Sequence, residues 1–159
     1  MLATGTIAPE IDAETSAGAR FKLSEQDGLC TVVYFFPKAF TPGCTRETAQ
    51  FQDSYNELRL VRATLVGVST DDHSTQCAFA HSLGASFPMI GDKSGAICKA
   101  YDVTWPLLGV AKRVTYVIGP NRVILGVFRH ELQVAKHKDD VLRMVDALHR
   151  EKHAPNEGA

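Results

Sequence analysis

The sequence lacks a strong charge of either sign and has no apolar run long enough to cross a lipid bilayer. Its 17 basic and 18 acidic side chains give a formal net charge of −1, which provides no field to concentrate nucleic acid or anionic lipid. The longest apolar run, around Val32 to Phe36, is far shorter than the ~20 residues that a membrane helix needs. The start of the chain shows no basic region followed by an apolar stretch. We therefore expect a cytoplasmic protein with no nucleic-acid or membrane partner.

Close cysteine pairs are also missing. The four cysteines are Cys30, Cys44, Cys77 and Cys98, and none is spaced as in a zinc site or a Cys-x-x-Cys redox motif. The six histidines show no ligand spacing and are expected mostly on solvated helix faces: His73, His81, His130, His137, His149 and His153. No phosphate-binding or dinucleotide loop is present. We expect no metal and no cofactor, and chemistry is the better explanation for at least one cysteine.

What is present fits one globular domain. The chain has 159 residues, of which 45% are hydrophobic, enough to bury a core but short for two independent domains. We expect a single domain over residues 1–151 and a polar C-terminal tail over residues 152–159.

Hydrophobic periodicity predicts the first half of the fold as a hairpin followed by a β-α-β-α order. A turn signal at residues 16–18 predicts the hairpin, which we expect at an edge of the sheet. The apolar runs at residues 31–36 and 64–69 are typical of strands buried on both faces. Thr41 as N-cap and Pro42 begin a helix to about Val61, and Asp71 or Asp72 caps a second helix that ends near Gly84.

The second half of the chain predicts a short helix, a hairpin and a final helix. The short helix spans residues 94–101, and a turn at residues 119–122 separates strands at 114–118 and 123–128. Val141, Leu142, Val145 and Leu148 recur at helical spacing near the C-terminus. Together the two halves predict an α/β protein with a thioredoxin-like fold, in which a mixed central sheet carries helices on both faces and an N-terminal β-hairpin precedes it.

Cys44 has a chemically suggestive place in this pattern. It lies two residues after Pro42, in the first helical turn, where unpaired N–H groups and the positive end of the helix dipole favour an anion. The thiolate is the nucleophilic form of cysteine, so this position favours reactivity. Free cysteine is also a common small buried side chain, and the position alone therefore decides nothing.

The residues around Cys44 are more specific. Residues 34–47 contain the spacing Pro-x-x-x-Thr-x-x-Cys, formed by Pro37, Thr41 and Cys44. This segment resembles the active-site loop of the peroxiredoxins, and its Thr-Pro-Gly-Cys-Thr-x-Glu wording is similar to the bacterioferritin-comigratory, or Q-type, subfamily. The similarity continues through residues 67–69, 87–88 and 112–118. The resemblance implies a thiol-dependent peroxidase that reduces hydrogen peroxide and organic hydroperoxides.

The same resemblance implies a role for each residue of the site. Cys44 would attack the peroxide and become a sulfenic acid, and the Thr41 hydroxyl would bind a peroxide oxygen. Arg113 would keep the thiolate ionised and stabilise the developing oxyanion. Glu47 would orient Arg113 through a bidentate pair, and Pro37 would shape the loop and shield the sulfur. For several of them simpler roles remain open: a plain N-cap for Thr41, a solvated surface side chain for Arg113, an exposed helix position for Glu47 and strand termination for Pro37.

The sequence indicates less clearly which thiol resolves the sulfenic acid. Members of the resembled subfamily carry a second cysteine five residues after the first, where this chain has Ala49, or on the next helix, at the place of Ala80. Cys77 lies one turn from Ala80 and is expected to face outward, with no packing reason to be a cysteine. We hypothesise a Cys44–Cys77 disulfide. Cys30 and Cys98 are interpreted as packing residues, although either could resolve instead.

Other functions stay open. If no internal cysteine resolves, an external thiol would reduce the sulfenic acid directly, as in a one-cysteine peroxidase. The protein could also be a redox sensor or holdase, whose cysteine oxidises once without turnover. A thioredoxin-type oxidoreductase is disfavoured because Glu47 stands where its second cysteine would be, and a glutathione-peroxidase-like enzyme gives no reason for Thr41 and Arg113. The resemblance further implies a thioredoxin-type reductant and a monomer.

Overall fold

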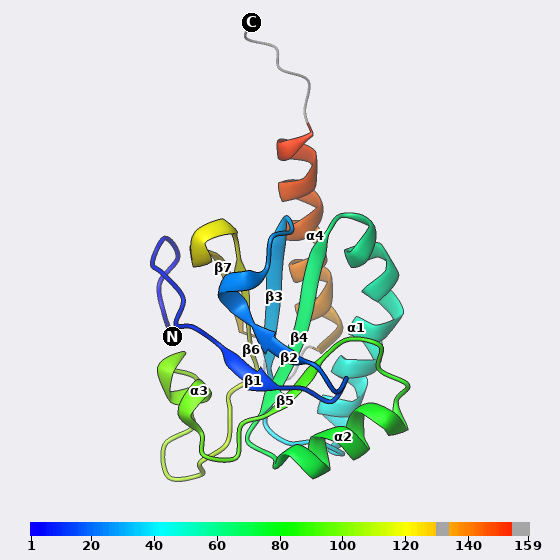
Figure 1. Cartoon of the computed structure of the whole chain (residues 1–159), viewed down its shortest axis with the longest axis vertical. Helices are drawn as coiled ribbons and strands as arrows, with labels where there is room; N and C mark the ends of the chain where they lie inside the picture. The colour runs from blue at the N-terminus through cyan, green and yellow to red at the C-terminus, as the bar shows by residue number, and fades with distance from the viewer. Residues whose placement is uncertain (130–133, 154–159) are drawn as a thin grey trace, which may run out of the picture.

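The computed structural model describes residues 1–129 and 134–153. In chain order its strands and helices are β1 (Asp12–Glu14), β2 (Arg20–Lys22), η1 (Leu23–Glu25), β3 (Cys30–Phe35), α1 (Pro42–Leu60), β4 (Ala63–Ser69), α2 (His73–Ser82), β5 (Met89–Gly91), α3 (Ala96–Ala100), β6 (Val114–Ile118), η2 (Pro120–Arg122), β7 (Ile124–Arg129) and α4 (Val134–Lys152). Figure 1 shows α1 and α4 running along the long axis of the sheet, with the N-terminal hairpin across its other side.

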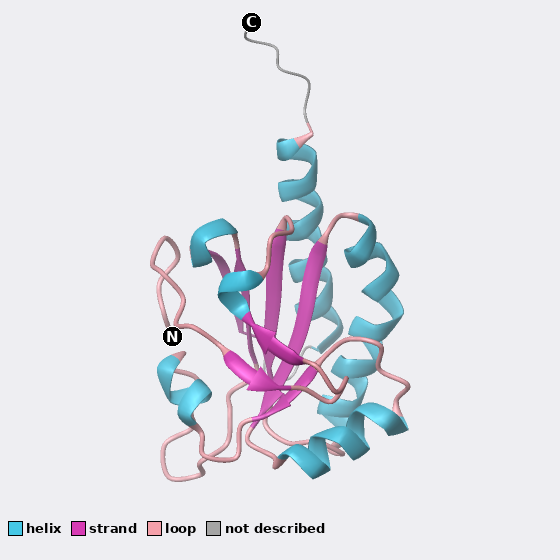
Figure 2. Ribbon diagram, in the orientation of Figure 1, coloured by secondary structure: helices cyan, strands magenta, loops and turns pink. Residues whose placement is uncertain are grey.

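The main sheet has five strands in the order β5-β4-β3-β6-β7. β3 pairs in parallel with β4, and β4 with β5, whereas β6 is antiparallel to both β3 and β7. The sheet is therefore mixed, as the β-α-β-α and β-β-α halves of the sequence predict, and its strands form the centre of the molecule in Figure 2.

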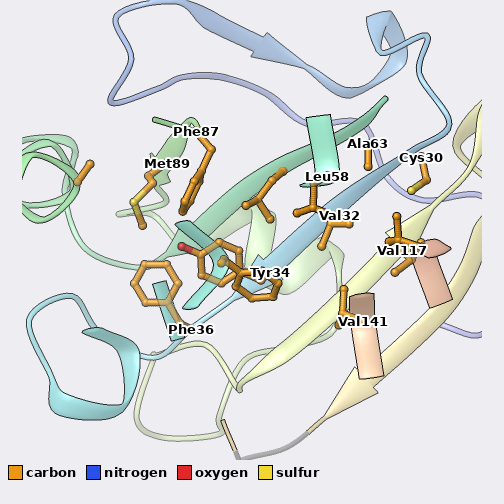
Figure 3. Packing of buried hydrophobic residues seen from close by; sticks show 14 of the residues in the cluster. Cys30, Val32, Tyr34, Phe36, Leu58, Ala63, Phe87, Met89, Val117 and Val141 are labelled. Carbon is orange, nitrogen blue, oxygen red and sulfur yellow. The ribbon is translucent and has the colours of Figure 1, made fainter. Parts of the chain in front are cut away.

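Two apolar clusters cover the two faces of this sheet. Val32, Tyr34 and Phe36 belong to the cluster that also contains the inner faces of α1 and α4, whereas Val33 and Phe35 belong to the cluster beneath α3 and the hairpin. Successive side chains of a strand point to opposite faces, so a continuous apolar run serves both clusters. Figure 3 shows the first cluster, with Tyr34 and Phe36 close to Phe87 and Met89, and with Val117 and Val141 at its other end.

The same alternation orients the chain at β6. Val117 packs in the cluster under α1 and α4, whereas Val114, Tyr116 and Ile118 pack in the other. Residues two apart along a strand share a face, so Thr115 and Arg113 are directed to the side on which α1 and α4 lie. The register of one strand thus directs a buried arginine toward the helix that carries Cys44.

Most predicted boundaries agree with the structure to within two residues, but the short strand β5 was not predicted, and the expected place of the N-terminal hairpin is wrong. β1 and β2 form a separate two-stranded sheet and not an edge of the main one. They are held to the main sheet at Ser16, whose amide donates to the Met89 carbonyl at 2.8 Å. Residues 154–159, most of the predicted tail, lie outside the described residues. No helix in the described part of the chain is both long and apolar enough to cross a membrane.

Candidate active site

The start of α1 is the frame of the site. Thr41 has extended backbone angles, φ −79° and ψ 151°, and its carbonyl accepts the first helical bond from the Thr45 amide at 2.8 Å. Thr41 is therefore the N-cap residue, as predicted, but among the described residues its side chain caps no helix amide. The hydroxyl instead donates to the Lys38 carbonyl at 2.8 Å. Thr41 therefore caps the helix through its backbone alone, because this bond turns the side chain back into the preceding loop.

Cys44 lies on the inner face of α1 and is only 1% exposed. Glu47, Thr48, Phe51 and Leu58 are buried on the same face, at the three- and four-residue spacing of an amphipathic helix. Thr48 is fixed by a 3.0 Å hydrogen bond with the Tyr34 hydroxyl. The sulfur is therefore held in the core at the end of the helix where the backbone N–H groups are unpaired.

Arg113, the residue directly before β6, reaches this sulfur. Its Nη2 donates to Cys44 Sγ at 3.4 Å, and its Nη1 donates to Glu47 Oε1 at 2.8 Å. A Cβ on Gly43 would lie 3.1 Å from Nη2, so the glycine provides the space that the guanidinium occupies. Arg113 is 5% exposed, which rules out the solvated surface role that the sequence left open.

Glu47 compensates the buried guanidinium. Burial by itself lowers the pKa of Arg113, but the negative charges of Glu47 and Cys44 outweigh it and raise the pKa above the ordinary value. Glu47 itself is 0% exposed, so the exposed-glutamate alternative is wrong. The predicted bidentate geometry is also wrong, because the second terminal nitrogen is directed to the sulfur. The guanidinium is a bridge between a carboxylate and a thiol.

The loop ahead of α1 is tied to the next strand. Pro37 is half-buried just after β3, and the Ala39 amide donates to Asp71 Oδ2 at 2.7 Å. The Ser69 hydroxyl donates to the same oxygen at 2.7 Å. The sequence indicated Asp71 only as an alternative cap of α2, whose actual N-cap is Asp72. Asp71 is thus a loop anchor, a role that no local sequence signal reveals.

Cys77 is half-buried, and its Sγ lies 3.4 Å from His73 Nε2, one turn earlier on α2. This contact lies on the exposed side of the helix. Ala80, the position next to it on the helix face, is buried in the core cluster that contains Cys44. All four cysteines, which lie in the described ranges, are free thiols.

Cys30 and Cys98 are buried, as expected for packing residues. Burial raises the pKa of Cys30 to about 12. Burial, followed by the negative charge of Asp92, raises the pKa of Cys98 as well. Both thiols are therefore protonated at neutral pH and are poor nucleophiles.

One buried side chain near the site was not predicted. His137 on α4 is 0% exposed, whereas the sequence led us to expect mostly solvated histidines. Its Nε2 contacts the Thr115 hydroxyl and lies 3.8 Å from Glu47 Oε2. The missed signal was its position four residues before Val141, on the apolar stripe of the final helix.

Comparison with known proteins identifies this constellation. The family model described as the AhpC/TSA family matches residues 4–127. The chain belongs to the AhpC/TSA family. It is a peroxiredoxin, and the resemblance drawn from residues 34–47 is confirmed. As a peroxiredoxin it reduces peroxide through a cysteine at the expense of a thiol reductant.

The similar proteins are named as Q-type and bacterioferritin-comigratory peroxiredoxins. Peroxiredoxin Q, chloroplastic, of Populus jackii is 33% identical over 145 residues, which cover 91% of this chain and 68% of the relative. The crystal structure of peroxidoxin BcpB from Mycobacterium tuberculosis has a TM-score of 0.85 at 32% identity and covers 92% of this chain and 98% of that one. The bacterioferritin comigratory protein of Xanthomonas campestris has a TM-score of 0.79 at 30% identity, covering 87% and 92%. These peroxiredoxins share the thioredoxin-like fold of this chain.

Proposed function

We propose that Cys44 is the peroxide-reacting cysteine of this peroxiredoxin. The observation that carries the proposal is the Arg113 guanidinium, 3.4 Å from the Cys44 sulfur and held by the buried Glu47. A fixed cation at this distance favours the thiolate and stabilises charge on a peroxide oxygen beside it. Cys30 and Cys98 are buried and have raised pKa values, so neither competes for this role.

The first step is attack of the Cys44 thiolate on one peroxide oxygen. An S–O bond forms, the O–O bond breaks, and the other oxygen leaves as hydroxide or alkoxide and takes up a proton. The Gly43 and Cys44 amides are the proposed hydrogen-bond donors to the peroxide. The Thr41 hydroxyl donates to the Lys38 carbonyl and is proposed to accept a hydrogen bond from the peroxide O–H, and Pro37 limits the access of water to the sulfur. The product is a sulfenic acid on Cys44.

The second step is attack of the Cys77 thiol on this sulfenic acid, which forms a disulfide and releases water. Because Cys44 is 1% exposed, the loop over residues 37–41 must move before the two sulfurs meet. Phe40 in this loop has a left-handed φ of 65°, a conformation that costs energy in a non-glycine residue and favours such a rearrangement. A dithiol donor of thioredoxin type then reduces the disulfide and restores both thiols.

Intact-mass analysis after peroxide treatment tests the scheme. We expect wild type to lose two hydrogens, Cys77→Ser to gain one oxygen, and Cys44→Ser to stay unchanged. Cys98→Ala is the matched control, because it also removes a cysteine and should give the wild-type disulfide yield. An equal disulfide yield in Cys77→Ser would remove Cys77 from the cycle, and oxidation without turnover in the presence of a thiol donor would favour a sensor.

Organic hydroperoxides are a proposed substrate class. The Xanthomonas campestris relative is described as having alkyl peroxide reduction activity, and here Phe40, directly before Thr41, exposes 55% of its surface. Its ring packs edge-on against Phe79 at 5.2 Å, which leaves apolar surface beside the site for an alkyl group. Phe40→Ser should lower kcat/KM for cumene hydroperoxide about threefold to tenfold relative to hydrogen peroxide. Leu60→Ser, exposed at the far end of α1, should leave the ratio unchanged.

We further propose a monomer in a reducing compartment such as the cytoplasm. The monomer is what the resemblance to Q-type peroxiredoxins implies, and the reducing compartment follows from the need for a thiol donor. The plant relatives are named as chloroplastic, so compartment differs among similar proteins. Sedimentation of the reduced protein tests the oligomeric state, and a mass twice that of one chain would contradict it.

A further inference from the structure

His137 is a buried titratable side chain that the proposed peroxidase cycle does not use. It lies on the inner face of α4, where Val141 and Val145 occupy the next two turns, and Figure 3 shows Val141 among the core side chains. Burying an imidazole where the neighbouring positions hold valine costs free energy unless its nitrogens find polar partners. The polar contacts of the imidazole must therefore explain why this position holds a histidine.

Its contacts lead directly to the reactive cysteine. His137 Nε2 contacts the Thr115 hydroxyl and lies 3.8 Å from Glu47 Oε2. The other oxygen of Glu47, Oε1, accepts from Arg113 at 2.8 Å, and Arg113 reaches Cys44 at 3.4 Å. Each oxygen of one carboxylate thus faces a different nitrogen-bearing side chain.

Glu47, Thr115 and His137 come from α1, β6 and α4, and these three elements shield their side chains from water. Thr115 is 0% exposed, as are Glu47 and His137. In such surroundings the attraction between Glu47 and Arg113 is weakly screened and therefore strong. A small rotation of the Glu47 carboxylate would therefore shift the Arg113 guanidinium with it. A carboxylate fixed at only one oxygen can rotate, whereas one with a ring beside the second oxygen is confined.

We propose that His137 is a positioning residue, which confines Glu47 and through it keeps Arg113 against the Cys44 sulfur. Thr115 in turn fixes the imidazole. The inference rests on the proposed role of Cys44 as the nucleophile and adds a residue from the last helix to that site. His137 touches neither the sulfur nor the peroxide in this scheme, and its effect passes through Glu47.

The test compares His137→Leu with His137→Gln. Leucine removes the polar ring, whereas the glutamine amide can donate from nearly the place of Nε2. We expect the rate constant for Cys44 oxidation by hydrogen peroxide to fall about tenfold in His137→Leu and to stay within about threefold of wild type in His137→Gln. Val141→Ala is the matched control, because it weakens the same helix face without touching Glu47, and should lower stability but not the rate.

A double-mutant cycle with Glu47→Gln separates positioning from general damage. If His137 acts through Glu47, then His137→Leu should add almost nothing in the Glu47→Gln background. Additive losses, or a rate in His137→Leu equal to wild type, would overturn the inference. If His137→Leu does not fold, Thr115→Val takes its place in the cycle, and an additive loss of rate in the Glu47→Gln background has the same meaning.

Cys44→Ser distinguishes failure of this inference from failure of the proposed function. Oxidation that persists in Cys44→Ser would refute the nucleophile itself, and with it the role of His137. Oxidation that is lost in Cys44→Ser but unchanged in His137→Leu would refute only the positioning role.

Discussion

Cys44 and Cys98 occupy the same place in two different helices. Each is the third residue of its helix, α1 or α3, and each is at most 1% exposed. What differs is the charged neighbour. Cys44 lies beside the Arg113 guanidinium, whereas the Cys98 amide donates to the buried Asp92 carboxylate at 2.9 Å. At α3 the anion at the helix start is therefore the aspartate, and the thiol stays protonated.

The difference shows that a helix start does not by itself make a cysteine reactive. Both sulfurs receive the same kind of backbone environment, but the charges beside them have opposite signs. The charge beside Cys44 comes from Arg113, 69 residues away along the chain, whereas the charge beside Cys98 comes from Asp92, only six residues away. Four measurements test how far this contrast holds.

The largest effect is expected from removing the sulfur at each helix. Cys44→Ser should lower peroxide turnover with a thiol donor by at least about a thousandfold, because a serine hydroxyl is not ionised at neutral pH. Cys98→Ala should stay within about twofold of wild type in the same assay. Comparable losses in both variants would mean that the two cysteines are not functionally distinct.

Removal of the cation is expected to have the next largest effect. Arg113→Met should slow Cys44 oxidation about a hundredfold, since the thiolate and the developing oxyanion both lose their charge partner. Arg113→Lys keeps the charge but cannot bridge Glu47 and the sulfur, so its rate should be intermediate. Stopped-flow measurement checks this order.

Because Arg113→Met leaves a buried carboxylate without its partner, the Arg113→Met/Glu47→Gln double variant is the control for folding. A double variant that is stable and as fast as wild type would show that the guanidinium is not needed for reactivity.

The pH dependence of the free energy of unfolding tests whether the unreactive thiols, Cys30 and Cys98, stay protonated in the folded protein. Burial raises the pKa of Cys30 to about 12 and, together with Asp92, raises that of Cys98, whereas an unfolded thiol ionises near a pKa of about 8.5. The folded state therefore binds more protons above pH ~8.5, and the stabilisation present below that pH is lost as pH rises toward the folded pKa values. Each group contributes a slope of about 1.4 kcal/mol per pH unit.

Urea unfolding at several pH values between about 9 and 11 measures this slope. The free energy of unfolding of Cys98→Ala should fall with rising pH less steeply than that of wild type, by about 1.4 kcal/mol per pH unit. An unchanged slope would mean that Cys98 ionises equally well in the folded protein, contrary to the contrast with Cys44.

The smallest effect is expected from changing Asp92, the carboxylate that accepts hydrogen bonds from the start of α3. Asp92 accepts hydrogen bonds from the Ile97 and Cys98 amides at 3.2 and 2.9 Å. Asp92→Asn keeps one acceptor of the two and should lower the free energy of unfolding by about 1 kcal/mol. Cys98 should still not oxidise, because burial is the larger cause of its raised pKa. Peptide mapping after peroxide treatment checks this. Oxidation of Cys98 in Asp92→Asn would show that the neighbouring negative charge alone keeps Cys98 unreactive.

The residues of the site were predictable to different degrees. Cys44 and Thr41 lie in one continuous segment, so local spacing and resemblance were enough to select them. Arg113 and its two partners, Glu47 and Cys44, were selected by resemblance. The burial of Arg113 and the single nitrogen that it directs to each partner were not predictable, because they depend on the pairing of β6 with β3. Cys77 remains a prediction as the resolving cysteine, and its contact with His73 lies on the exposed side of α2.

The sequence by itself determined the order of the helices and of every strand except β5, the helix start at Cys44 and the family likeness. These depend on interactions between residues close in the chain: hydrophobic periodicity, capping and turn chemistry. Only the tertiary structure decided that the hairpin forms its own sheet, that Asp71 anchors the active-site loop and that His137 lies beside Glu47. Such contacts join residues that are tens of positions apart, and their energies depend on burial and distance, which no local pattern encodes.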